Sequence, residues 1–197
     1  MSKKILVIAG PTGSGESTVT RELIKRYPIF TRLVTATTRE PRLNEKDGQD
    51  YYFFSEEEFK KEVTIGNIIE HTFVTGRAVY YGTYKPDLEQ KLNAGFNIIV
   101  NPDVVGARYY KKNYEATTIF IKTESISVLE KRLKGRDPNI SEVELKRRLE
   151  AAKYELDNEE SFYDYVLVNK DNKLEEVLTE IVEILQKEGY ILALPPR

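Results

Sequence analysis

The chain lacks the residue on which several kinds of chemistry depend. None of its 197 residues is cysteine. This absence excludes a disulfide, a thiolate nucleophile and a zinc site built on thiolates. Any chemistry must therefore rest on hydroxyl, carboxyl, amide or basic side chains, or on the backbone itself.

Long apolar runs and an excess of either charge are also missing. The first apolar run, residues 5–9, is too short for the core of a signal peptide, and no stretch approaches a membrane span. The 30 basic and 32 acidic residues nearly cancel, so no overall field favours nucleic acid or an anionic membrane. With 40% hydrophobic and 31% charged residues, the composition is typical of a globular protein, which we expect in the cytoplasm.

Short apolar runs alternate with longer stretches of helical spacing. Strands buried on both faces are predicted at 5–9, 97–100, 117–121 and 165–168. Helices are predicted at 16–27, 86–94, 104–114, 126–136, 142–162 and 173–188. This alternation predicts an α/β fold, in which βαβ crossovers build a mostly parallel sheet flanked by helices on both faces.

One long stretch, residues 35–83, interrupts this alternation. Its segments are rich in aromatic residues and alternate between apolar and polar positions, and Gly76-Arg77 predicts a hairpin turn between the last two. Ser55 and Glu58 frame a capping box for a short helix. We therefore predict a small mixed lobe inserted into the α/β core.

A second interruption separates two basic helices. Helix-breaking residues gather at 135–139, and Ser141 with Glu144 repeats the capping box where the helix restarts. The sequence therefore predicts one α/β core with two insertions, one of them large.

The glycine-rich segment 10–17, Gly-Pro-Thr-Gly-Ser-Gly-Glu-Ser, joins the first strand to the first helix. Its spacing matches the phosphate-binding P-loop, Gly-x-x-x-x-Gly-Lys-Ser/Thr, except at the lysine. Glycines let successive backbone N–H groups converge on phosphate oxygens, and the helix N-terminus adds its positive dipole end. A glycine-rich turn without a ligand is the alternative, but the spacing and the strand–loop–helix context favour phosphate binding. The predicted phosphate-binding residues are Gly10, Thr12, Gly13, Ser14, Gly15, Ser17 and Thr18.

Glu16 occupies the position of the lysine that normally reaches the β- and γ-phosphates. Two unit charges about 4 Å apart at an effective dielectric constant near 20 interact by about 4 kcal/mol. A carboxylate in place of an ammonium group replaces attraction to the phosphates by repulsion, which changes the interaction energy by up to roughly twice that amount. Since 1.36 kcal/mol corresponds to a factor of ten in rate, we expect impaired turnover. The sequence leaves open whether Glu16 is a natural loss, an engineered inactivation or an adaptation to other cations.

Residues 37–53 carry the most specific pattern in the chain, Thr-Thr-Arg-Glu-Pro-Arg-Leu-Asn-Glu-Lys-Asp-Gly-Gln-Asp-Tyr-Tyr-Phe. This pattern resembles the signature of guanylate kinases, in which Thr-Thr-Arg-x-Pro is followed by a basic residue, an acidic residue and Gly-x-x-Tyr-x-Phe. The P-loop, Glu70, Tyr81-Gly-Thr83 and Arg132-x-x-x-Arg136 also appear in the family order. The resemblance therefore covers nearly all of residues 4–187.

The resemblance implies a single domain, 1–197, with a P-loop NTPase core. Its parts would be the core at 1–34, 84–126 and 151–197, the GMP-binding lobe at 35–83 and a helical lid at 127–150.

The resemblance also implies a complete acceptor site. Two arginines offer planar, bidentate donors to a phosphate dianion, and tyrosine hydroxyls complete its shell. The GMP phosphate would be held by Arg39, Arg42, Tyr51 and Tyr81. Glu70 would accept from the guanine N1–H and amino group, which adenine cannot offer, while Thr35 and Thr83 would bond the remaining purine edge. The alternative is that the arginines form surface ion pairs, the tyrosines pack the lobe and Glu70 faces solvent.

The segment Asn101-Pro102-Asp103 resembles the family's strand ending in Asp-x-Asp, with Asn101 at the first aspartate and Pro102 as the intervening residue. Asn101 replaces the first aspartate and offers at best a neutral oxygen to Mg²⁺ or its waters. Asp103 remains as a candidate for metal or acceptor-side contacts, against the simpler role of a helix N-cap. The Ser17 hydroxyl and Asp103 are therefore the predicted ligands of Mg²⁺, the one cofactor implied.

The lid pattern of the family is intact. Arg132 and Arg136 share one helix face, and Arg148 lies in the second basic stretch; in the family such arginines close over the ATP phosphates. A solvated basic helix face is the alternative. Asn169 matches the family residue that contacts adenine. His71, the one histidine, is assigned no catalytic role, because phosphoryl transfer needs positioning more than a base.

These residues predict Mg²⁺-dependent transfer of the γ-phosphoryl group from ATP to GMP, giving ADP and GDP. Two alternatives remain open. One is a non-catalytic module with a guanylate-kinase fold that binds GMP or a phosphorylated ligand, and the other is a related P-loop kinase for another acceptor. The expected partners are ATP and GMP, with no nucleic acid or membrane, and the oligomeric state stays open.

Overall fold

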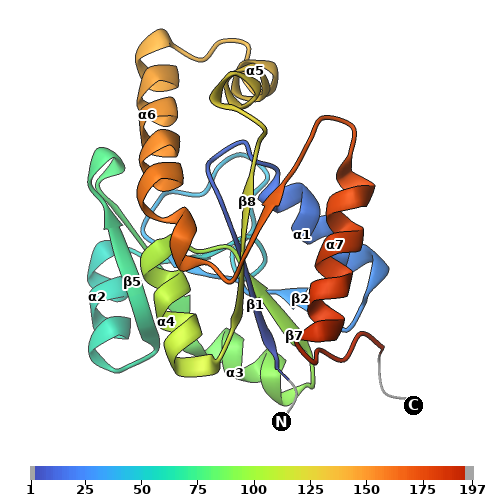
Figure 1. Cartoon of the computed structure of the whole chain (residues 1–197). Coiled ribbons are helices and arrows are strands. Elements are labelled where there is room, and N and C mark those ends of the chain that lie inside the picture. Colours follow the sequence, from blue (N-terminus) through green and yellow to red (C-terminus); the bar gives the residue numbers. More distant parts are fainter. Residues whose placement is uncertain (1–2, 194–197) are drawn as a thin grey trace.

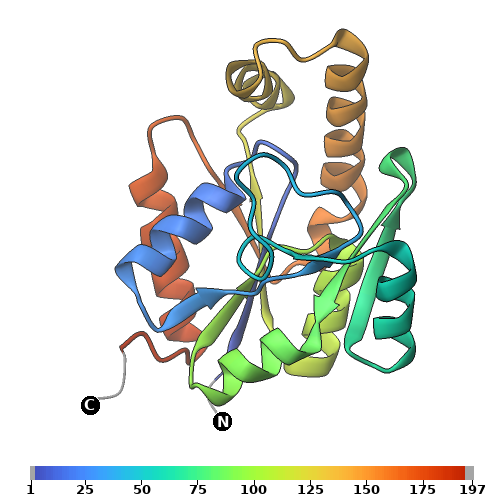
Figure 2. The ribbon, with the colours of Figure 1, turned by 180° about the vertical axis from the view of Figure 1, so that it is seen from behind.

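The structure is a computed structural model, and it describes residues 3–193. A parallel sheet of five strands forms the centre of the protein (Figures 1 and 2). The strand order is β2-β7-β1-β8-β9. The bounds are β1 Ile5–Ala9, β2 Phe30–Arg32, β7 Asn97–Val100, β8 Thr117–Lys122 and β9 Tyr165–Val168. The four predicted strands are confirmed. The edge strand β2 spans only three residues, too few to give a periodic signal in the sequence.

Helices cover both faces of this sheet. One face packs against α1 (Glu16–Arg26) and α7 (Leu174–Lys187), and the other against α3 (Lys85–Asn93) and α4 (Val104–Tyr114) (Figure 1). Successive side chains of a strand point to opposite faces, and β1 therefore sends Leu6 and Ile8 to the first face and Ile5, Val7 and Ala9 to the second. This two-sided burial explains why its sequence is apolar without alternation.

A second, mixed sheet is built from strands within residues 36–84, in the order β4-β3-β6-β5. The bounds are β3 Ala36–Thr37, β4 Tyr52–Phe53, β5 Ile68–Val74 and β6 Val79–Tyr84, with α2 at Glu56–Thr64. The predicted hairpin is confirmed, since β5 and β6 pair antiparallel around the 3₁₀ turn η1, Thr75–Arg77. The capping box of Ser55 and Glu58 is complete at the start of α2.

The helices α5 (Ile126–Arg136) and α6 (Glu142–Asn158) stand beyond the carboxyl ends of the central strands (Figure 1). They pack on each other through a separate apolar cluster of Leu129, Leu133, Leu145 and Ala152. The helix predicted to reach residue 162 ends earlier, and a 3₁₀ turn, η2 Glu160–Phe162, follows it.

The second predicted capping box, at the start of α6, is only half formed. The Ser141 hydroxyl accepts from the Glu144 amide at 3.2 Å, as predicted. The Glu144 carboxylate, however, binds Arg147 and Arg148 instead of returning to the helix start. These two arginines lower the pKa of Glu144 to about 2. The prediction of the reciprocal bond is therefore wrong, because charged partners compete for the carboxylate.

Among residues 3–193 there is no helix that combines the length and the apolar character needed to cross a bilayer.

Candidate active site

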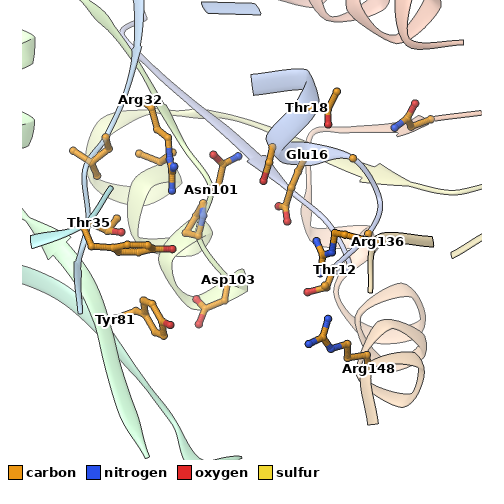
Figure 3. A pocket seen from close by; sticks show the side chains of 18 of the residues that line it. Thr12, Glu16, Thr18, Arg32, Thr35, Tyr81, Asn101, Asp103, Arg136 and Arg148 are labelled. Atoms are coloured by element: carbon orange, nitrogen blue, oxygen red, sulfur yellow. The ribbon is translucent and has the colours of Figure 1, made fainter. Parts of the chain in front are cut away.

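A cavity of about 1120 Å³ lies at the carboxyl ends of the central strands, between the second sheet and the α5–α6 pair (Figure 3). Residues that follow β1, β2, β7 and β9 all contribute to it. Ligands of open α/β sheets bind at this edge. The predicted site residues that line the cavity are Thr12, Gly13, Gly15, Glu16, Ser17, Thr18, Thr35, Arg39, Arg42, Tyr51, Glu70, Tyr81, Thr83, Asp103, Arg132, Arg136, Arg148 and Asn169. The two predicted residues that do not line it are Gly10 and Ser14.

Glycine is required at two points of the phosphate loop. Gly10 has φ 153°, and a Cβ there would lie 2.0 Å from the Ile121 carbonyl oxygen. Gly15 has φ 104° at the N-cap of α1, and a Cβ would lie 2.2 Å from the Asn169 side-chain nitrogen. Because no L side chain fits these positions, the glycines fix the shape of the loop.

Ser14 belongs to the loop but does not line the cavity. It is fully buried, and its amide donates to the Pro11 carbonyl oxygen at 2.8 Å. The N–H groups of Glu16 and Ser17, in the first helical turn, have no partner within the helix, and both residues line the cavity. The backbone cradle for an anion is therefore built around the start of α1.

Glu16 projects its side chain into the cavity (Figure 3). Burial, together with the charge of Glu155, raises the pKa of Glu16 to about 8, against opposing effects of Arg32 and Arg136. The carboxyl group is therefore mostly protonated at pH 7 when the cavity holds no ligand. This changes the electrostatic expectation from the sequence. The loop lacks its cation, but at neutral pH it does not carry a full negative charge in its place.

Asn101 is held by the core. Its side-chain nitrogen donates to the Ile8 carbonyl oxygen at 2.9 Å and to the Thr20 hydroxyl at 3.1 Å. Asp103 caps α4, since its carboxylate accepts from the Gly106 amide at 3.0 Å, and it also lines the cavity. The N-cap role that was weighed against a ligand role is thus present. The second carboxylate oxygen has no hydrogen-bond partner among the described residues.

The donor set near the phosphate loop fits Mg²⁺ held mainly by a nucleotide. Within residues 3–193, no group of three or more His, Cys, Asp or Glu side chains is arranged to hold a metal ion. Mg²⁺ commonly uses one or two protein ligands and completes its shell with phosphates and water. The Ser17 hydroxyl and the Asp103 carboxylate, which both line the cavity, supply that number.

Arg39 is held in place by acidic and aromatic neighbours. Its guanidinium bonds Glu45 at 2.9 Å and lies over the rings of Tyr51 and Phe53, at 5.3 and 5.7 Å from their centroids. The Nε atom is buried and has no partner among the described residues. Arg42, by contrast, is exposed to solvent, although it also lines the cavity. The two arginines therefore offer one oriented cation and one that is free to reorient.

Glu70 is turned into the cavity by an irregularity in β5. The pairing of β5 with β6 shifts register between Ile68 and His71, and such bulges redirect side chains. The Oε1 atom of Glu70 accepts from the Thr83 hydroxyl at 3.4 Å, while Oε2 is buried without a partner among the described residues. Burial and the nearby Asp103 charge raise the pKa of Glu70 to about 7.

Thr83 links Glu70 to α4, because its hydroxyl also lies 2.6 Å from the Tyr110 hydroxyl. The sequence placed Glu70 inside an apolar run and left open whether it faces solvent, and the bulge explains why it faces the cavity.

The three arginines predicted to belong to a lid differ in their partners. Arg132 bonds Asp171 at 3.0 Å and the carbonyl oxygens of Ser14 and Asn169 at 3.1 and 2.7 Å. Arg148 bonds Glu144 at 2.7 Å. The guanidinium of Arg136 makes no hydrogen bond or ion pair with residues 3–193. Arg132 therefore fastens α5 to the phosphate loop in this conformation.

Asn169 also supports the loop. It is buried, and its side-chain nitrogen donates to the Ser14 carbonyl oxygen at 2.7 Å. Asn169 and Arg132 thus hold the same carbonyl group from two directions. His71 packs against Phe59 and Tyr80 in the second sheet and does not line the cavity.

Sequence reasoning missed several residues of the cavity wall, among them Arg32, Thr72, Tyr110 and Asp171. Arg32 ends the short strand β2, whose sequence gave no signal. Asp171 follows Asn169 by two residues, and its proximity to Arg132 depends on how α5 packs. Tyr110 has the pattern of an ordinary apolar helix position, and its contact with Thr83 could not be read from periodicity.

The strand–loop–helix phosphate cradle on a parallel sheet defines a P-loop fold of the kind found in small-molecule kinases. A shikimate kinase structure from Bacteroides thetaiotaomicron supports the fold alone, with a TM-score of 0.50 at 15% identity over 93% of this chain and 98% of that one.

The particular family follows from closer matches. The guanylate kinase family model matches residues 2–188. A guanylate kinase from Synechocystis sp. is 36% identical over 186 residues, which cover 94% of each chain. The crystal structure of guanylate kinase from Anaplasma phagocytophilum is similar with a TM-score of 0.73 and 31% identity, over 95% of this chain and 87% of that one. The chain belongs to the guanylate kinase family, a family of nucleotide-binding kinases.

Proposed function

We propose that this protein transfers the γ-phosphoryl group of ATP to GMP, giving ADP and GDP. The observation that carries this proposal is the buried Glu70 carboxylate, whose Oε2 atom has no partner among the described residues. A buried acceptor without a donor costs free energy unless a ligand supplies the donor. The guanine N1–H and amino group together present two donors to one carboxylate, whereas adenine presents an acceptor at N1.

The acceptor phosphate would lie against Arg39, Arg42 and the hydroxyls of Tyr51 and Tyr81. The rings of Tyr51 and Tyr81 lie 5.9 Å apart, and both residues line the cavity together with Glu70. Guanidinium groups bind phosphate oxygens in a bidentate manner. Base recognition at one end and phosphate recognition at the other fit a nucleoside monophosphate.

The donor phosphates would lie at the start of α1, with Mg²⁺ held by Ser17 and Asp103 and Asn169 at the adenine side. The metal would neutralise charge on the transferring group. An oxygen of the GMP phosphate forms the new bond to the γ-phosphorus as the bond to ADP breaks. The attacking phosphate is already a dianion near pH 7, so no base has to remove a proton.

The residues of the chain contribute by placing the two nucleotides in line and by supplying positive charge. Arg136 and Arg148 line the cavity from α5 and α6. We assign the acceptor to a lobe at 35–83 and the arginines to a lid at 127–150, both closing over the core at 1–34, 84–126 and 151–197 to exclude water.

Calorimetry with GMP and AMP tests the acceptor assignment. We expect GMP to bind at least about tenfold more tightly than AMP, because a hydrogen bond to a charged group contributes about 1.5–3 kcal/mol. The variant Glu70→Gln should lose most of that preference. Equal affinity for the two nucleotides in the parent chain would refute the assignment.

A non-catalytic binding module is the second candidate, and Glu16 in the phosphate loop favours it. One measurement distinguishes the two candidate functions. A coupled assay of ADP release with ATP, GMP and Mg²⁺ should show turnover that depends on GMP. Tight GMP binding without any GMP-dependent ADP release, in both the parent chain and Glu16→Lys, would select the binding module.

A further inference from the structure

Six arginines line the cavity, and they differ in whether their guanidinium groups are already engaged. Three are paired with carboxylates: Arg39 with Glu45, Arg132 with Asp171 and Arg148 with Glu144. The guanidinium groups of the other three make no hydrogen bond or ion pair within residues 3–193. These three are Arg32, Arg42 and Arg136.

Arg32 differs from the other two in its support. It is the last residue of β2, paired in register with Ile99 of the central sheet, and its carbonyl oxygen accepts from the Lys91 ammonium at 2.8 Å. Arg42 lies in the loop before β4, and Arg136 is the final residue of α5. The backbone of Arg32 is therefore fixed by the core, whichever way the lobe and the α5–α6 pair move.

Arg32 and Glu16 project into the same part of the cavity from opposite walls (Figure 3). The two side chains nevertheless form no ion pair within 4 Å. Arg32 thus brings positive charge close to the position of the missing lysine without being neutralised by Glu16.

We propose that Arg32 supplies the cation that the phosphate loop lacks, by contacting phosphoryl oxygens between the donor and acceptor nucleotides. This proposal rests on the proposed phosphoryl transfer. A guanidinium group suits the role, because its planar fork binds two oxygens of one phosphoryl group and stays charged at any relevant pH. An interaction that strengthens as charge develops in the transition state raises turnover more than it raises substrate affinity.

The test removes Arg32 in two backgrounds, the parent chain and Glu16→Lys. In the parent chain, Arg32→Met should lower kcat at least about tenfold while the KM for GMP changes less than about threefold. In the Glu16→Lys chain the same substitution should lower kcat by less than about threefold, because the introduced ammonium group now supplies the charge.

A matched control is Arg21→Met, an exposed arginine on α1 that pairs with Glu22 and lies outside the cavity. It should leave kcat unchanged in both backgrounds. Arg32→Lys should fall between parent and Arg32→Met, since it keeps the charge and loses the fork. Thermal melting of each variant shows whether it folds. If Arg32→Met does not fold, the comparison of Arg32→Lys with the parent in both backgrounds tests the proposal.

Binding of a non-hydrolysable ATP analogue with Mg²⁺ gives a readout that does not need turnover. We expect Arg32→Met to weaken it about threefold in the parent chain, which is less than its effect on kcat, and to leave it unchanged in Glu16→Lys. An equal effect in both backgrounds, or no effect in the parent chain, would overturn the proposal.

GMP calorimetry on the same samples separates this result from the proposed function. Absence of GMP binding would contradict the guanine assignment, whereas the analogue measurements would still decide whether Arg32 replaces the lysine.

Discussion

The proposed acceptor and donor halves of the cavity are built to different degrees of completeness. On the acceptor side, Arg39 is oriented by Glu45 and by aromatic rings, and Glu70 has a buried oxygen without a partner among the described residues. On the donor side the backbone cradle is intact, but Glu16 stands in place of a lysine and Asn101 is tied into the core. The two halves therefore separate recognition of the acceptor from stabilisation of the transferring charge.

The difference shows which parts of such a site depend on the backbone and which on single side chains. The shape of the phosphate loop is fixed by Gly10 and Gly15, and by the bonds of Asn169 and Arg132 to the Ser14 carbonyl. These features survive without the lysine. The positive charge at position 16 is lost with the lysine. This loss matters, because electrostatic stabilisation by preorganised charge is commonly the largest single contribution to such catalysis.

The largest expected effect tests the donor half directly. Glu16→Lys should raise turnover with ATP and GMP at least about a hundredfold, corresponding to roughly 2.7 kcal/mol of recovered transition-state stabilisation. The affinity for GMP should change much less, because the acceptor residues are untouched. Steady-state kinetics and GMP calorimetry on the same preparations check both statements.

Glu16→Gln is the control for this variant. Because the parent side chain is mostly protonated at pH 7, the glutamine variant should stay within about threefold of the parent rate there. Turnover that is unchanged in Glu16→Lys would place the block elsewhere, with Asn101-Pro102 as the next segment to test. A parent rate already equal to that of Glu16→Lys would contradict the electrostatic comparison of the two halves.

A smaller effect tests the acceptor half through pH. The pKa of Glu70 is raised to about 7, and the proposed contact with guanine requires the ionised form. The ionised fraction rises about tenfold between pH 6 and pH 8, so the ratio of GMP affinity to AMP affinity should rise by about the same factor. The ratio cancels the titration of the phosphate group that the two nucleotides share.

Calorimetry at the two pH values measures this ratio, and Glu70→Gln should make it independent of pH. A parent ratio that is flat across this range would mean that Glu70 does not recognise the base through its charge.

The sequence predicted the fold well where the signal was local and repeated. The apolar runs and helical spacings gave the strands and helices of the core, and the P-loop spacing gave the strand–loop–helix junction. The short strand β2 was not predicted, because three residues are too few to show a period. Arg32, at its end, was therefore not identified as a site residue. The direction of Glu70 depends on a register shift in β5, and the half-formed cap at Glu144 depends on competition from two arginines. Long-range packing decides such features, and a local pattern does not encode it.

The smallest expected effect concerns stability and follows from the same glutamate. The pKa of Glu16 is about 8 in the folded protein and 4.5 ordinarily, so the folded state binds a proton that the unfolded state has released between these values. Stability is therefore lost as the pH rises from about 4.5 and levels off above about 8. Replacing Glu16 with glutamine, a neutral residue of the same shape, removes this pH-dependent loss of stability.

Glu16→Gln should therefore stabilise the protein by at least about 1 kcal/mol at pH 8.5. For a chain of this length, 1 kcal/mol corresponds to about 2–4 °C in Tm, so we expect a gain of at least about 2–4 °C at pH 8.5 and a smaller gain at pH 5. Thermal melts followed by circular dichroism at both pH values measure the gain, with the exposed Glu124→Gln as a control that should change Tm at neither. Equal gains at pH 5 and pH 8.5 would mean that the benefit comes from packing and not from the proton. The missing lysine would then have left a carboxylate that stays ionised, and the donor half of the cavity would carry the full repulsion expected from its sequence.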